Sequence, residues 1–194
     1  MVTYMRIVMR GLADGDGQVL AGALNGRKVL ANLVEQTGQE PTAPEPVFMD
    51  FSGVEVATAS FLRETVLAFR DTVRRRRSNF YPVIANASAL VEDELKVLLE
   101  SDGNVLMLCS LDENNNPHEA RLAGDLDPKQ RLTFDLVQQR RETDAAELMR
   151  EHGESEKVKQ TAWNNRLAAL ASLGLVVELS QGRAKRYRPL FMES

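Results

Sequence analysis

The stretch TAWNNRLAALASLGLVVELSQGRAKRYRPL, residues 161–190, changes its periodicity half-way along its length. In the first half Leu167, Leu170 and Leu173 recur at helical spacing, and Gly174 follows as a residue type that commonly ends helices. In the second half two β-prone arms flank the letters SQG, which is the pattern of a tight turn. The stretch therefore predicts a helix followed directly by a β-hairpin.

Two further helices are predicted upstream of this stretch. The spacing of apolar residues places the three helices over 131–142, 143–153 and 155–174. Thr143 or Asp144 is placed to cap the second helix, and Gly153 to end it. The third helix is polar and basic at its start and apolar at its end. That division suits a helix whose N-terminal half enters a DNA major groove while its remainder is held in a core.

Three short helices followed by a basic hairpin resemble the winged helix-turn-helix domain of bacterial transcription regulators. In that family a helix ending L..L...GLV is followed by a strand, a basic wing and a second strand, as in TAWNNRLAALASLGLVVEL and GRAKRYRPL here. The resemblance covers about residues 131–190 and implies binding of double-stranded DNA, with Asn suited to adenine and Arg to guanine or phosphate. The residues expected to contact DNA are Lys157, Lys159, Thr161, Asn164, Asn165, Arg166, Arg183, Lys185, Arg186 and Arg188.

The charge of the chain is unevenly distributed. The formal net charge is −4, yet the residues from Lys129 onward hold 12 Lys and Arg against 9 Asp and Glu, a balance of +3. The remainder holds 12 basic and 19 acidic residues, a balance of −7, which opposes DNA at long range. Within a Debye length of about 8 Å the local cations are expected to outweigh these acids. We expect a homodimer that presents two recognition helices to major grooves about 34 Å apart, with a hairpin that meets solvent or protein as the alternative.

Trp163 is the only tryptophan of the chain. An indole at this place can stack on a base or fill the space between helices. Packing in the core or in a dimer interface is favoured, because single aromatic residues inside helices usually pack.

The first part of the chain alternates predicted strands and helices, the pattern of an α/β layer. Strands are predicted over 5–12, 47–54, 81–87 and 104–111, with a short antiparallel strand over 118–124. Helices are predicted over 24–38, 57–77 and 90–101. The segment GDLDPKQ, residues 124–130, breaks every pattern and is a linker candidate. We therefore expect an α/β domain over 1–125 and a small α+β domain over 126–194.

The segment VFMDFSGVEVATASFLRETVLAF, residues 47–69, resembles the STAS fold of sulfate transporter tails and anti-sigma factor antagonists. The resemblance covers about residues 5–112 and is closer still to STAS-like domains that carry DFSGV followed by SF. In the antagonists a serine at the start of this helix is phosphorylated by a partner kinase of the GHKL ATPase class. The resemblance implies Ser60 as the phosphoacceptor, at a helix N-terminus whose dipole favours an anion. A capping role for Ser60, Thr58 and Ser52, or a small ligand held there, stays open.

Other functions are disfavoured by what the sequence lacks. The Gly-rich segment GDGQVLAGALNGRK has neither phosphate-loop nor dinucleotide spacing, and no G-x-S-x-G elbow occurs, so no enzyme is expected. Cys109, His118 and His152 are too few and too scattered for a metal cluster, and no cofactor is expected. No apolar run reaches the roughly 20 residues of a membrane helix, so a cytoplasmic regulator is predicted.

Arg74 to Arg77 end the second helix, where they either meet solvent or contact a polyanion. The alternative to a DNA-binding regulator is a signalling module that binds only proteins.

Overall fold

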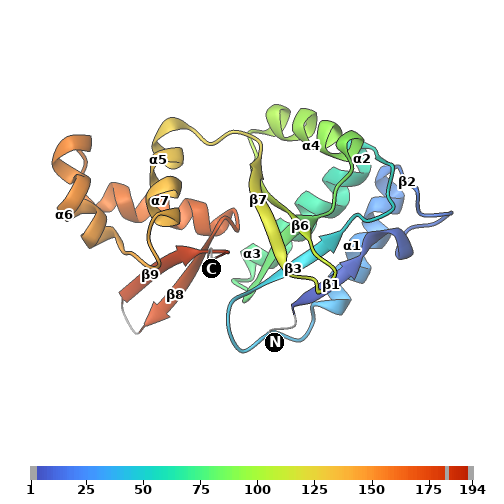
Figure 1. Cartoon of the computed structure of the whole chain (residues 1–194), viewed down its shortest axis with the longest axis horizontal. Coiled ribbons are helices and arrows are strands. Elements are labelled where there is room, and N and C mark those ends of the chain that lie inside the picture. Colours follow the sequence, from blue (N-terminus) through green and yellow to red (C-terminus); the bar gives the residue numbers. More distant parts are fainter. Residues whose placement is uncertain (1–3, 182–183, 192–194) are drawn as a thin grey trace. The chain divides into compact units, whose positions relative to one another are not determined.

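A computed structural model describes residues 4–181 and 184–191 of the chain. The chain divides after Asp125 into two compact units. Each unit contains both helices and strands, so the protein is of the mixed α/β class (Figure 1). Arg183, one of the expected DNA contacts, lies outside the described residues.

The first unit is built on a mixed five-stranded sheet in the order β1-β3-β5-β6-β7. The strands are β1 (Met5–Val8), β3 (Glu45–Asp50), β5 (Phe80–Ala85), β6 (Leu106–Leu111) and β7 (Pro117–Ala123). The first four are parallel neighbours, whereas β7 returns antiparallel to β6, as the sequence predicted. A separate parallel pair joins β2 (Val19–Leu20) to β4 (Val56–Ala57).

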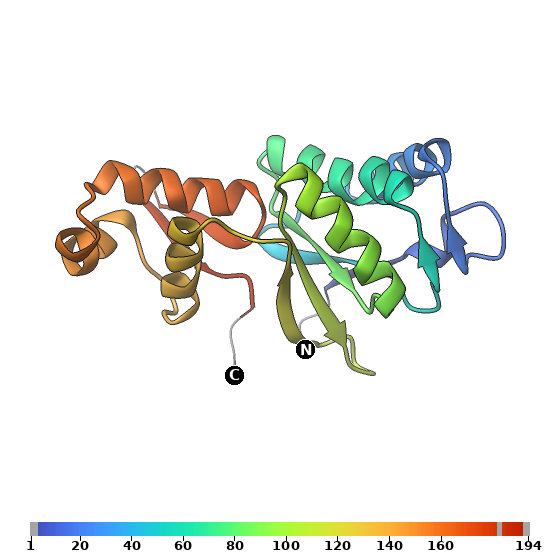
Figure 2. The same cartoon turned by 90° about the horizontal axis from the view of Figure 1, so that it is seen from above.

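Helices cover one face of this sheet (Figure 2). They are α1 (Ala23–Gln36), α2 (Ala59–Leu62), α3 (Ala68–Arg75) and α4 (Ala89–Asp102), with a short 3-10 turn η1 (Met9–Gly11) after β1. Alternate strand residues such as Val47, Met49 and Ile84 point into a core shared with Phe61 and Phe69 of the helices. The residues between them, such as Phe48 and Val83, are also buried, so the strands read as nearly continuous apolar runs.

The helix predicted over 57–77 is not one regular helix. Between α2 and α3 lies a π-helical turn, η2 (Arg63–Leu67). There Thr65 Oγ1 donates to the carbonyl of Gly26 in α1 at 2.9 Å. A Cβ added to Gly26 would lie 2.9 Å from the Phe61 carbonyl oxygen, so α1 approaches this turn closely only because Gly26 lacks a side chain.

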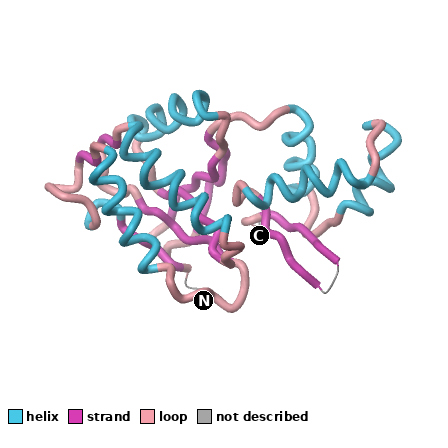
Figure 3. The backbone as a smooth tube through the Cα atoms, turned by 180° about the vertical axis from the view of Figure 1, so that it is seen from behind, coloured by secondary structure: helices cyan, strands magenta, loops and turns pink. Residues whose placement is uncertain are grey.

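The second unit consists of three helices followed by an antiparallel hairpin (Figure 3). These elements are α5 (Pro128–Gln138), α6 (Ala145–Glu156), α7 (Gln160–Ser172), β8 (Val176–Gln181) and β9 (Ala184–Pro189). Thr143 forms a further antiparallel bridge with Tyr187 of β9. The buried residues Trp163, Leu167 and Leu170 of α7 supply a large part of the core, and α7 packs against both α5 and α6.

Several predicted helix boundaries in this unit are wrong, and the first helix runs over Pro128–Gln138 rather than over 131–142. Gly153 does not end the second helix, because α6 continues to Glu156. A Cβ on Gly153 would clash with the Met149 side chain and lie 3.3 Å from the Val158 carbonyl oxygen, so this glycine serves a close contact. The third helix begins at Gln160 rather than at residue 155.

Candidate nucleic-acid interface

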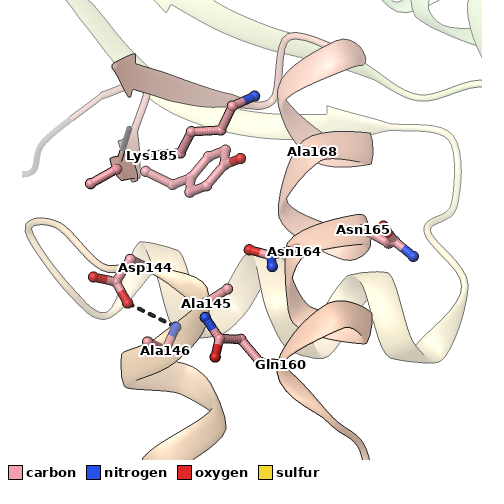
Figure 4. Close-up of a pocket in the computed structure, with 10 residues that line it drawn as sticks. Asp144, Ala145, Ala146, Gln160, Asn164, Asn165, Ala168 and Lys185 are labelled. Atoms are coloured by element: carbon pink, nitrogen blue, oxygen red, sulfur yellow. Dashed lines mark hydrogen bonds between the residues drawn. The ribbon is translucent and has the colours of Figure 1, made fainter. Parts of the chain in front are cut away.

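The exposed side of α7 forms one wall of an open groove of about 560 Å³ in the second unit. The groove is bordered by the start of α6 and by β9, so three elements of the unit meet around it (Figure 4). Gln160, Asn164 and Ala168 line it at intervals of four residues along α7. Gln160 and Asn164 point toward α6, and Asn165, the next residue of α7, also lines the groove (Figure 4). The predicted recognition helix therefore presents a polar, uncharged stripe.

The N-terminus of α6 is already occupied by a carboxylate. Asp144 accepts hydrogen bonds from the backbone nitrogens of Ala146 at 2.8 Å and Glu147 at 2.9 Å. Glu147 in turn accepts from the Asp144 nitrogen at 3.2 Å, which completes a capping box. The prediction of a cap at Asp144 is confirmed. Since these donors are satisfied, this helix end offers little to a phosphate.

The basic residues of the hairpin do not form a single surface. Successive strand side chains point to opposite faces, so Lys185 and Tyr187 face the groove while Arg186 and Arg188 lie on the other face. The sequence groups these cations because it shows their spacing and not the alternation of a strand. Lys185 is also ion-paired with Glu178 at 2.9 Å.

Arg186 is held by acidic residues of its own unit. Its guanidinium donates to Glu142, to Asp144 at 2.9 Å and to Glu147 at 3.2 Å. The hydrogen bond to Glu142 is the main reason that the pKa of Arg186 is raised above its ordinary value. Because three carboxylates surround its guanidinium, Arg186 links β9 to the start of α6 and is not available to contact a phosphate.

The remaining expected contacts occupy different surroundings. Lys157 and Lys159 are exposed in the connection between α6 and α7, and Thr161 is exposed on the first turn of α7. Arg166 is half-buried, with its guanidinium 4.9 Å from the centre of the Trp163 ring. Trp163 is fully buried, so it packs in the core as favoured from the sequence and is not available to stack on a base.

Ser60, the phosphoacceptor candidate of the first unit, is exposed on the first turn of α2. The helix is capped by Thr58, whose hydroxyl accepts from the Phe61 nitrogen at 3.4 Å and from the Gly22 nitrogen at 3.2 Å. The Ser60 hydroxyl lies 3.2 Å from that of Thr58. Ser52 plays no part in this cap, because its hydroxyl donates to Asp50 at 2.6 Å.

A buried polar cluster at the end of β3 was not foreseen from the sequence. Asp50 is fully buried and accepts hydrogen bonds from Arg6 at 2.7 Å and from Asn86 at 2.8 Å, in addition to Ser52. Burial alone would raise the pKa of Asp50, but the hydrogen bonds from Ser52, Asn86 and Arg6 outweigh it and hold the pKa below its usual value. The cluster joins β1, β3 and the loop after β5.

Several other side chains have structural partners. Arg74 donates to the carbonyls of Ser78 and Phe80, and Arg76 to that of Thr37, so the four-arginine run is only partly solvated.

Burial raises the pKa of the Cys109 thiol to about 12. Among residues 4–181 and 184–191, no group of His, Cys, Asp and Glu is arranged to hold a metal ion. In the same ranges no helix is long and apolar enough to cross a membrane.

Comparison with known proteins assigns no family. No family model matches the chain, and the curated proteins contain no match to it. Within α7, two groove residues were not among the predicted DNA contacts, Gln160 and Ala168. Their spacing of four residues from Asn164 was a signal available in the sequence, whereas the acids that bind Arg186 are brought to it only by the fold.

Proposed function

We propose that the protein is a transcriptional regulator that binds double-stranded DNA through a winged helix-turn-helix in its second unit, under the influence of a STAS-like first unit. The observation that supports this most is the stripe of exposed polar residues on α7, set between the start of α6 and the hairpin. A recognition helix needs such a face to meet base edges, and flanking elements to meet the backbone.

Phosphate contacts on this proposal come from few cations. Lys157 and Lys159 precede α7 and are exposed, and Lys185 faces the groove. Each phosphate neutralised contributes about 0.9 to the slope of log affinity against log salt. With Arg186 held by carboxylates, we expect a slope of about 2 to 3 for each protomer, and twice that for a dimer on two half-sites.

Fluorescence anisotropy with a random-sequence duplex at low and raised salt tests the proposal. We expect binding that weakens with salt, and a double variant Lys157→Ala/Lys159→Ala that binds less tightly with a slope smaller by about 2. Lys129→Ala is the matched control, because Lys129 is an exposed lysine of the same unit at the start of α5. Absence of salt-dependent binding, or an equal effect of all these lysines, would rule the interface out.

The alternative is a signalling module that binds only proteins. The specific observation in its favour is the acidic cluster of Glu142, Asp144 and Glu147, which repels phosphates near one border of the groove. On either reading Ser60 is an accessible candidate for phosphorylation by a partner kinase. Incubation with a GHKL-type ATPase encoded beside this protein, followed by intact mass measurement, tests this role. An unchanged mass, or a phosphate that persists in Ser60→Ala, refutes it.

A further inference from the structure

The stripe that α7 turns toward the groove has a definite chemistry. Gln160 and Asn164 carry side-chain amides, and Ala168 ends the stripe with a methyl group. A side-chain amide presents a donor and an acceptor side by side, which matches the N6 donor and N7 acceptor of adenine in the major groove. A small apolar side chain suits the thymine methyl group.

Guanine readers are missing from this stripe. The usual reader of guanine is an arginine that reaches O6 and N7 together. No arginine lines the groove within the described part of the chain, and Lys185, the lysine that does line it, is ion-paired with Glu178 at 2.9 Å. Arg166, the arginine of α7, places its guanidinium over the Trp163 ring, and Arg186 is ion-paired with three carboxylates.

The amides are free to change partner. Neither Gln160 nor Asn164 forms a hydrogen bond with the other groove residues drawn, and both are exposed (Figure 4). Residues four apart on a helix are separated by about 6 Å along its axis. Base pairs are stacked about 3.4 Å apart, so neighbouring members of the stripe meet positions about two base pairs apart when the helix lies along the groove.

We infer that α7 reads adenine–thymine base pairs, with Gln160 and Asn164 bonding two adenines and Ala168 contacting a thymine methyl. The inference rests on the proposed DNA binding and adds its base specificity. Asn165 also lines the groove beside the stripe, and we assign it, with Thr161, to the DNA backbone.

Selection from a duplex library with a randomised core, using the full-length protein at low salt, tests the inference. We expect enrichment of sites with two adenines about two base pairs apart. Replacing either A·T pair by G·C should weaken binding about 5- to 150-fold. Gln160→Ala and Asn164→Ala should each remove the preference at one of these positions, while Gln138→Ala, a control at an exposed amide of α5 that does not line the groove, keeps both preferences.

A change in the DNA provides an independent arm. 7-Deazaadenine lacks the N7 acceptor but keeps the N6 donor, so placing it at a preferred adenine should weaken wild-type binding, by less than the corresponding alanine variant does. Binding without base preference, a preference for G·C, or an A·T preference that survives both variants and the deaza base would overturn the inference and leave the proposed DNA binding intact. Absence of binding to any duplex would overturn both.

Discussion

At the scale of single residues, Asp50 shows how the first unit holds a buried charge. The carboxylate has no exposed surface, and an isolated ion in such a place costs several kcal/mol. Here Arg6 supplies a counter-charge, while Ser52 and Asn86 supply neutral donors. The ends of two parallel strands are tied together as a result, which makes the cluster a support for the fold.

Replacement of Asp50 should therefore be costly and should change the response to acid. We expect Asp50→Asn to lower the free energy of unfolding at pH 7 by about 3 kcal/mol. Because the pKa of Asp50 is lowered in the folded state, its contribution is present above the unfolded pKa of about 3.9 and is lost as the pH falls through the folded pKa. The acid-induced loss of stability below about pH 4 should thus be shallower in the variant.

Urea unfolding between pH 2 and pH 7 measures both effects. Asp14→Asn is the control, because Asp14 is 75% exposed and pairs with the 59% exposed Lys28 at 2.9 Å. An exposed pair of this kind contributes about 0.5 kcal/mol. Equal losses in the two variants would contradict the structural role of Asp50.

Buried polar clusters of this kind are difficult to predict from the sequence. Asp50 sits in the letters MDFSG, where a polar residue at a strand end is unremarkable. Its partners Arg6 and Asn86 lie 44 and 36 residues away in the chain. The same distance problem affects Arg186, whose three acidic partners lie 39 to 44 residues upstream. Long-range pairing is set by the fold and cannot be seen in local spacing.

At the scale of elements, most helices and strands follow from periodicity, and the exceptions lie where a close contact overrides local preference. Gly153 looks like a helix terminator, yet α6 continues past it to Glu156, and Met149 and Val158 lie close to it. The π-helical turn η2 interrupts a helix of regular apolar spacing where α1 presses against it at Gly26. Neither exception leaves a mark in the spacing of apolar residues, so periodicity could not have predicted it.

Gly26 offers a test at this scale. Alanine is favoured over glycine inside a helix by about 1 kcal/mol, so an exposed Gly→Ala change would stabilise α1. The added Cβ of Gly26→Ala would instead meet the Phe61 carbonyl at 2.9 Å and Thr65 Oγ1 at 3.0 Å, in the core. We expect thermal unfolding to report a net loss of about 1 to 3 kcal/mol.

The control for this substitution is Gly11→Ala. Gly11 is exposed, and a Cβ added to it has nothing within 4 Å. Its stability should change by less than about 0.5 kcal/mol. A stabilised Gly26→Ala variant would show that α1 and η2 are not in the contact described.

At the scale of the whole molecule, charge is divided unevenly along the chain. The residues from Lys129 onward carry a balance of +3 and the remainder −7. The sequence located this division and the helices around the groove. It overestimated the hairpin as a cationic surface, because Arg186 is neutralised and the basic residues alternate between two faces. DNA recognition on this account depends on α7 more than on the wing.

Nuclear magnetic resonance of the full-length protein, titrated with an A·T-containing duplex, tests that central claim most directly. At 21.6 kDa the chain is within reach of amide-resolved spectra. We expect the side-chain amides of Gln160 and Asn164 and the backbone amides of Lys157 and Lys159 to shift most, with Asp50 and its neighbours unchanged. Spectra in which α7 stays unperturbed, while saturating duplex shifts other residues or none, would contradict it.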